Sequence, residues 1–174
     1  MNSQTDDSKS GQATKDGGWN SFWQTTGEDS ALDSGGFELL QFKQIWSQLF
    51  NELFQKQVNC HLLDVACGNG LLTQLAHQCA QEMKASSLFS CLDISQQAIL
   101  GIKNKLPEVN AVVGDAGKLP FADGQFDLVV SHFGIEYADT NAFNEAYRAV
   151  SYTHLRAHET VLDLVCRLLL EKKK

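Results

Sequence analysis

Apolar and polar residues follow one another along the chain in blocks whose lengths suit strands and helices in turn. The first block, Leu62–Gly70 (LLDVACGNG), is mostly apolar or small, contains one carboxylate and ends in a glycine-rich turn. An amphipathic run, LLTQLAHQCAQEM, follows it directly. A buried strand, a tight turn and a helix in this order predict the first unit of an open α/β sheet, in which ligands bind beyond the carboxyl ends of the strands.

Three further apolar runs continue the pattern. They are Ser87–Cys91 with Leu92, closed by Asp93; Val109–Val113, followed by Gly114-Asp115; and FDLVVSHF from Phe126, which ends at Ser131-His132. Between the first two, SQQAILGIKNKL has helical spacing, and Ser95 is placed as its N-cap. Strands that alternate with helices predict an α/β fold, with a parallel sheet covered by helices on both faces.

The N-terminal third shows two other patterns. Met1–Gly18 is polar and lacks apolar periodicity, so we expect it to be disordered. Phe37–Phe54 has an apolar stripe, which predicts a helix that packs on the sheet or covers a substrate. The stripe contains Leu39, Phe42, Trp46, Leu49 and Leu53, and is widened by Ile45 and Phe50.

Carboxylates stand at the ends of the predicted strands. Asp93 lies about 20 residues after the glycine turn, a spacing that suits the two hydroxyl groups of a ribose. Gly68 and Gly70 would let the backbone pass close to a ligand. Each acid also has a structural alternative: Asp64 could cap the following turn, Asp93 could cap the helix at Ser95, and Asp115 could be an ordinary turn residue.

Taken in order, these motifs resemble the class I S-adenosylmethionine-dependent methyltransferases, in particular the small-molecule group with the ubiquinone/menaquinone-type enzymes. Asp64-x-Ala66-x-Gly68-x-Gly70 is similar to their acid-x-Gly-x-Gly-x-Gly motif, with alanine at the first glycine. Asp93 matches their ribose-binding acid, and Asp115, within GDAGKLPFADGQFDLVVS, matches the acid beside the adenine amino group. The resemblance covers Trp19–Ala149 and implies a Rossmann-like, mainly parallel sheet of which strands one to four are present.

The resemblance also implies a cofactor, a reaction and a set of site residues. The cofactor is S-adenosyl-L-methionine, and its methyl group passes by direct displacement to a small-molecule acceptor. The implied cofactor-binding residues are Asp64, Ala66, Cys67, Gly68, Asn69, Gly70, Asp93, Ile94, Asp115, Ala116 and Ser131. Asp64 would lie near the amino group of the methionine part, and no metal is expected.

Three further features each have a functional and a structural interpretation. His132, just past the fourth strand, is either a catalytic base or a rim histidine with a structural partner. We expect Cys67 to be a packing residue and not a nucleophile. The aromatic segment with Trp19, Phe22 and Trp23 either covers the active site, as in many small-molecule members of the family, or anchors the helix below it.

The main alternative class is an NAD(P)-dependent Rossmann oxidoreductase. Its G-x-G-x-x-G motif would place a third glycine at position 73, where this chain has Thr73. The chain also lacks a Tyr-x-x-x-Lys pair for hydride chemistry. A second alternative is a non-catalytic fragment without a function of its own.

Length, net charge and cysteine content limit the classes of partner and the cellular location that we expect. The chain has 174 residues, which suits one domain, and 21 Asp and Glu against 14 Lys and Arg give a net charge of −7. This charge disfavours binding to nucleic-acid phosphates or anionic membranes. Five cysteines without a Cys-x-x-Cys pair predict a reducing, cytoplasmic location. We expect no membrane span and no signal sequence, and the acceptor and the oligomeric state stay open.

The last segment, Val150–Lys174, departs from the α/β pattern. VSYTHLRAHET and LVCRLLLEK match, base by base, the translation of a transposase-type sequencing adapter, so we expect this tail to be non-native and the methyltransferase domain to be truncated at Ala149. The alternative is an amphipathic C-terminal helix. Without the rest of the family sheet, the strand from Phe126 would leave an apolar, aggregation-prone edge, the tail would dock poorly or as an isolated helix, and the chain would be inactive.

Overall fold

The computed structural model describes residues 18–26, 37–150, 153–155 and 167–172. A helix over residues 18–25 comes first. It is followed by α2 (Phe37–Lys56), β1 (His61–Val65), α3 (Leu71–Glu82), β2 (Leu88–Asp93), α4 (Gln96–Lys105), β3 (Asn110–Val113), η1 (Ala116–Lys118), β4 (Leu128–His132), η2 (Ile135–Tyr137), α5 (Ala142–Ala149), β5 (Thr153–Leu155) and β6 (Arg167–Lys172). Apart from Gly18, the segment expected to be disordered lies outside the described residues.

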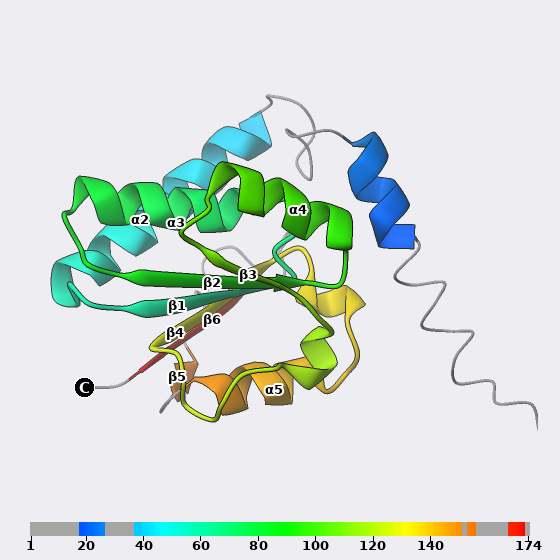
Figure 1. Ribbon diagram of the computed structural model, residues 1–174. Coiled ribbons are helices and arrows are strands. Elements are labelled where there is room, and N and C mark those ends of the chain that lie inside the picture. The colour runs from blue at the N-terminus through cyan, green and yellow to red at the C-terminus, as the bar shows by residue number, and fades with distance from the viewer. Residues whose placement is uncertain (1–17, 27–36, 151–152, 156–166, 173–174) are drawn as a thin grey trace, which may run out of the picture.

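The strands form one sheet in the order β3-β2-β1-β4-β6-β5. The four strands predicted from the sequence are all present, and they pair in parallel, β1 with β2 and β4, and β2 with β3. Helices α2, α3 and α4 cover one face, and α5 lies on the other (Figure 1). The predicted α/β fold with helices on both faces is confirmed.

Helix α2 packs on the sheet, which is one of the two positions predicted for it. Its most buried side chains are Phe42, Trp46, Phe50 and Phe54, each four residues from the next. Leu39, Leu49 and Leu53, which the predicted stripe included, are only partly buried beside this core. Residues four apart form a ridge along a helix surface, and here that ridge is entirely aromatic.

The opposite face of the sheet packs against small residues. Val65 and Val129 of the sheet share a core with Ala142, Ala146 and Ala149 of α5. Alanine side chains let the helix backbone lie close to the strands. Helix α5 is eight residues long, and its buried face consists of alanines, so that face contains no run of large apolar residues at helical spacing.

The edge of β4 is paired, which contradicts the expected open edge. Strand β6 lies antiparallel to β4, with Val130 opposite Leu169, and β5 pairs with β6 in turn. Residues 153–155 and 167–172 of the tail therefore form strands of the sheet, which contradicts the expected isolated helix for these residues. An unpaired edge offers a row of N–H and C=O groups that an extended segment can satisfy through its backbone alone. The adapter origin of the tail stays a prediction.

Candidate functional site

A cavity of about 330 Å3 lies at the carboxyl ends of the four parallel strands. Ten predicted site residues line it, namely Asp64, Ala66, Cys67, Gly68, Asn69, Asp93, Ile94, Asp115, Ala116 and His132. They come from four chain segments that only the sheet brings together. The position agrees with the general rule that open α/β sheets bind ligands beyond the carboxyl ends of their strands.

Two predicted site residues are not part of the cavity wall. Gly70 has a φ of 80°, and a Cβ built on it would lie 2.7 Å from Cγ1 of Ile102, so the small residue serves the packing of α4 and not ligand approach. Ser131 is fully buried within β4. Alternate residues of a strand point to opposite faces, so a residue near the end of β4 need not face the site.

Asp93 holds the glycine turn in place. Its Oδ2 accepts a 2.8 Å hydrogen bond from the N–H of Gly68, and its Oδ1 accepts one of 2.8 Å from the N–H of Ser95. Asp93 therefore has a structural role, but the side chain that caps α4 is that of Ser95, as predicted for Ser95. Since an ionised carboxylate has about four acceptor positions, Asp93 can still accept hydrogen bonds from a ligand in the cavity.

Asp64 is buried at the base of the same cavity. Its Oδ2 accepts a 2.7 Å hydrogen bond from the hydroxyl of Thr73 in α3. Burial, and to a smaller extent the nearby charge of Asp93, raise the pKa of Asp64 to about 7, although the Thr73 hydrogen bond opposes this shift. Burial also raises the pKa of Asp93. Two buried carboxyl groups side by side make this end of the cavity favourable for a cation.

Asp115 follows β3 and lies on another part of the cavity wall. Its Oδ1 accepts a 2.8 Å hydrogen bond from the N–H of Gly117 and so caps the short helix η1. The side-chain amide of Asn141 donates to the carbonyl of Gly117 from the other side. Asp115 thus has the turn role described as its structural alternative, and it also lines the cavity.

The loops after β1 and β4 meet in a strained arrangement. Ala66 and Phe133 both have a φ of 56°, which L-residues rarely adopt. A Cβ built on Gly134 would lie 2.5 Å from the carbonyl oxygen of Ala66. Strained backbone of this kind clusters at functional sites. Ala66 occupies the position where the resembling motif has glycine, which the observed φ explains.

Aromatic side chains form part of the cavity wall. Trp19 and Trp23 of the helix over residues 18–25 line it together with Phe42, Phe133 and Tyr137, and Trp19 lies 5.7 Å from Tyr137 between ring centroids. Asn20 links this helix to α4, because its Oδ1 accepts a 2.9 Å hydrogen bond from the hydroxyl of Ser95. The aromatic segment thus both lines the cavity and is anchored at Ser95, and its role as a cover stays a prediction. Sequence patterns pointed to neither Phe133 nor Tyr137.

Trp23 packs directly against Gly68. A Cβ built on Gly68, which has a φ of 53°, would lie 2.7 Å from Cη2 of Trp23 and closer still to Cζ2. The glycine is therefore required by the indole above it, whereas the sequence pattern suggested only the approach of a ligand. The indole and the glycine turn form one wall of the cavity.

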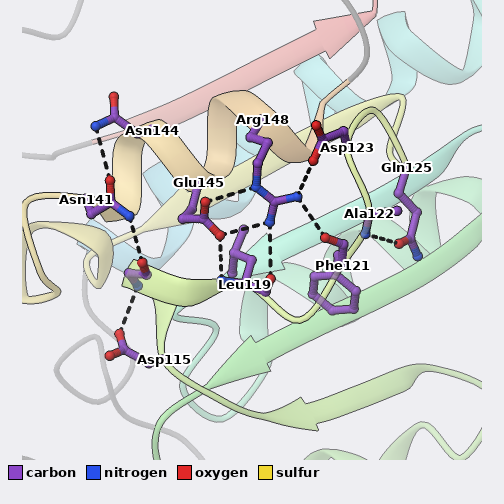
Figure 2. A network of polar contacts seen from close by, with 11 residues as sticks. Asp115, Leu119, Phe121, Ala122, Asp123, Gln125, Asn141, Asn144, Glu145 and Arg148 are labelled. Carbon is purple, nitrogen blue, oxygen red and sulfur yellow. Dashed lines mark hydrogen bonds and ion pairs between the residues drawn. The ribbon is translucent and has the colours of Figure 1, made fainter.

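The segment after η1 is held by Arg148 of α5 (Figure 2). The guanidinium donates to the carbonyls of Phe121, at 2.8 Å, and Leu119, at 3.1 Å, and it pairs with Asp123 and Glu145. Hydrogen bonds with Glu145 and then Asp123 raise the pKa of Arg148 above its usual value. The network ties α5 to the chain between the Asp115 turn and β4.

Other groups contribute little chemistry to the site. Burial raises the pKa of Cys67 well above its usual value, which makes it a poor nucleophile and agrees with a packing role. Within the described ranges, no cluster of three or more His, Cys, Asp or Glu side chains is arranged to hold a metal ion. None of the described helices combines the length and apolarity needed to span a bilayer.

Solved structures with a similar fold include a methyltransferase, CalH, in complex with SAH, which is 16% identical (TM-score 0.51; 68% of this chain and 38% of that chain). A candidate S-adenosyl-L-methionine-dependent methyltransferase from Methanococcus maripaludis is 19% identical (TM-score 0.51; 86% of this chain and 62% of that chain). At these identities the likeness concerns the fold.

Sequence relatives are named ubiquinone/menaquinone biosynthesis C-methyltransferases. The protein from Rickettsia felis is 31% identical over 114 residues, which cover 59% of this chain and 46% of the relative. The protein from Dinoroseobacter shibae is 29% identical over 127 residues, which cover 68% of this chain and 47% of the relative. The chain therefore spans about half the length of these relatives.

A family model described as a methyltransferase domain matches residues 62–153, which is more than half of the chain. The match includes the glycine turn and the four acids that line the cavity, Asp64, Asp93, Asp115 and Asp139, and no comparison supports the oxidoreductase alternative. The chain therefore belongs to the class I, S-adenosylmethionine-dependent methyltransferase family.

Proposed function

We propose that this chain binds S-adenosyl-L-methionine in the cavity, within a protein that methylates a small molecule. The observation that carries the proposal is the convergence of the three predicted carboxylates, Asp64, Asp93 and Asp115, and a glycine turn on one cavity at the strand ends. A sulfonium cofactor with an amino group, a ribose and an adenine offers donors or positive charge to each of these acids. The residues present therefore fit the cofactor.

Each acid has a proposed partner. The free acceptor positions of Asp93 would take the ribose hydroxyls, while its two existing hydrogen bonds keep the carboxylate pointed at the cavity. Asp115 would accept from the adenine amino group. Asp64, which is only 1% exposed, would pair with the ammonium of the methionine part. The positive charge of the ammonium would favour the ionised form of Asp64.

When bound, the cofactor would supply an electrophilic methyl carbon, and a nucleophile on the acceptor would form a bond to it as the methyl–sulfur bond breaks and S-adenosylhomocysteine leaves. The protein then has mainly to align the two partners and exclude water. Trp19, Trp23 and Phe133 are placed to do this, because they line the cavity with apolar surface. This step requires no covalent intermediate on the protein.

We infer a small apolar acceptor from the same aromatic lining of the cavity. The names of the relatives, which concern ubiquinone and menaquinone biosynthesis, support this class. The net charge of −7 argues against a nucleic-acid acceptor. None of the four described cysteines forms a disulfide, which supports the proposed cytoplasmic location.

Calorimetry with S-adenosylhomocysteine tests the cofactor proposal. Asp93→Ala should weaken binding at least about tenfold, because hydrogen bonds to a charged group contribute roughly 1.5–3 kcal/mol each. Asp123→Ala is the matched control, since it removes an exposed carboxylate outside the cavity wall and should leave the affinity unchanged. Equal affinities for the wild type and Asp93→Ala would refute the ribose assignment.

The same measurement separates this proposal from dinucleotide binding. Thr73 is fully buried, and its hydroxyl is committed to Asp64, at the position where a dinucleotide fold needs glycine for close packing beside the pyrophosphate. We expect no heat of binding with NADH at concentrations that saturate S-adenosylhomocysteine binding.

We also propose that residues 150–174 do not belong to the gene. The support is the base-by-base adapter match and the abrupt loss of the α/β pattern after Ala149. Sequencing the locus from an adapter-free amplicon tests it: a different continuation after codon 149 is expected, and the same 25 codons would overturn the proposal.

A further inference from the structure

The imidazole of His132 is held among three aromatic rings at the end of β4. Its ring centroid lies 4.7 Å from Phe42, 5.7 Å from Trp46 and 4.5 Å from Phe133, at interplanar angles of 65°, 84° and 68°. Edge-to-face packing on this scale restricts rotation of the imidazole. The orientation of its two nitrogens is therefore set by the surrounding rings.

A hydrogen bond from Trp46 defines which nitrogen carries the proton. The indole Nε1 lies 3.2 Å from Nδ1 of His132. An indole N–H can only donate, so Nδ1 must accept through its lone pair, and the neutral imidazole then carries its proton on Nε2. Trp46 is only 1% exposed, so water does not compete for this hydrogen bond.

We propose that Trp46 is a positioning residue that keeps His132 in its Nε2–H form, so that His132 donates a hydrogen bond to the methyl acceptor instead of removing its proton. A general base needs an available lone pair. In this form the Nδ1 lone pair is engaged by Trp46, and Nε2 is already protonated. This inference rests on the proposed methyltransferase function and deepens it.

The acceptor class follows from this donor. His132 lines the cavity beside Phe42 and Phe133, two rings that suit a flat apolar molecule. A donor in this wall selects an acceptor with an oxygen lone pair, such as a hydroxyl, phenolate or carbonyl oxygen. The hydrogen bond orients the molecule and involves no proton transfer, so no further reactant is needed.

Long-range 1H–15N NMR correlation of the histidine ring tests the protonation state directly. His132 should show a protonated Nε2 and an unprotonated Nδ1, assigned by the loss of its signals in His132→Gln. In Trp46→Phe the Nδ1–H form should gain population, whereas Trp19→Phe, the same change at a tryptophan not bonded to His132, should leave the pattern unchanged. A protonated Nδ1 in the wild type, or no change in Trp46→Phe, would overturn the proposal.

Binding of phenol to the protein saturated with S-adenosylhomocysteine tests the donor role. His132→Gln, which places an amide N–H near the position of Nε2, should keep phenol affinity within about threefold, and His132→Phe should lose about tenfold. Toluene, which has no oxygen, should bind both variants equally. Equal phenol affinity in His132→Gln and His132→Phe contradicts the donor role.

These outcomes are separable from failure of the proposed function. If S-adenosylhomocysteine does not bind the wild type, the cofactor proposal fails, while the NMR pattern of His132 still reports on the Trp46 hydrogen bond. If the cofactor product binds and the tautomer is the opposite one, only the present inference fails.

Discussion

The hydroxyl of Thr73 donates a 2.7 Å hydrogen bond to Oδ2 of Asp64 inside the core of the protein. Both residues are buried, and the pair joins β1 to α3 directly beneath the glycine turn. The hydrogen bond lowers the pKa of Asp64, but burial outweighs it and places the pKa at about 7. A carboxyl group whose pKa is raised on folding makes the stability of the protein depend on pH.

Asp64→Asn should stabilise the ligand-free chain at pH 8. Asp64 binds its proton more tightly in the folded than in the unfolded state, where its pKa is near 3.8, so its contribution to stability declines as pH rises from about 4 to 7. The amide has no such dependence. Urea unfolding should therefore show a higher midpoint for the variant at pH 8 and no difference near pH 4; a lower midpoint at pH 8 contradicts the assigned pKa.

The same variant should bind the cofactor product less tightly. Loss of the negative charge opposite the ammonium should cost about tenfold or more in affinity for S-adenosylhomocysteine at pH 8. In the wild type the affinity should fall as pH drops below about 7, because Asp64 becomes protonated, and in Asp64→Asn this dependence should disappear. A wild-type affinity that is constant from pH 8 to pH 6 would argue against Asp64 as the ammonium partner.

Gly68→Val should abolish cofactor binding while leaving the sheet folded. The new side chain would collide with Trp23 and also force a β-branched residue into a left-handed backbone conformation. Displacement of Trp23 should shift the tryptophan emission to longer wavelength, and far-ultraviolet circular dichroism should be retained. Gly101→Ala, in α4 with open space around it, is the control; normal binding by Gly68→Val would refute the proposed approach of the ligand to this loop.

Ala66→Gly should be tolerated and should raise stability by up to about 1 kcal/mol. Ala66 has a φ of 56°, and glycine adopts this conformation without the steric penalty of a Cβ, although it loses more backbone entropy on folding. Ala116→Gly, at a buried site without a positive φ, should destabilise instead. If thermal unfolding shows Ala66→Gly to be the more destabilised of the two, the backbone of the turn differs from the one described.

Arg148→Ala should lower the free energy of unfolding by about 1–3 kcal/mol, because two backbone carbonyls and Glu145 lose a charged donor. Asp123→Ala removes only the exposed ion pair of the network and should change the free energy of unfolding by less than about 0.5 kcal/mol. Arg148 holds down the pKa of Glu145, so the contribution of the pair should be lost as pH falls through the lowered pKa of Glu145. Equal effects of Arg148→Ala and Asp123→Ala in urea titrations would contradict the assigned role of Arg148 in holding the segment after η1.

Deleting residues 151–174 should make the protein associate. Strand β6 pairs with the whole of β4, from Leu128 to His132, and its removal leaves a buried apolar strand as an edge. Size-exclusion chromatography with light scattering should detect oligomers for the deletion and not for a control that lacks only residues 173 and 174. A monomeric deletion variant would show that β6 does not protect β4.

Local sequence patterns were sufficient for the four parallel strands and for α2, α3 and α4, because each of these segments has its own apolar periodicity. Helix α5 escaped detection, since its buried face consists of Ala142, Ala146 and Ala149. The pairing of β4 with β6 also escaped, because strand pairing through the backbone leaves almost no trace in the side chains of either partner.

The glycine turn and the acids Asp64, Asp93 and Asp115 could be predicted from the sequence, because they stand at or just after the ends of predicted strands, at the spacing of the family motifs. The sequence by itself thus pointed to the family and to three of the four acids that line the cavity, whereas Asp139 was not predicted. Only the tertiary structure decided that Gly68 is required by Trp23, that Gly70 serves Ile102, and that Trp46 reaches His132 across 86 positions. Such contacts depend on how helices and strands pack in space, and packing joins residues whose separation along the chain carries no signal.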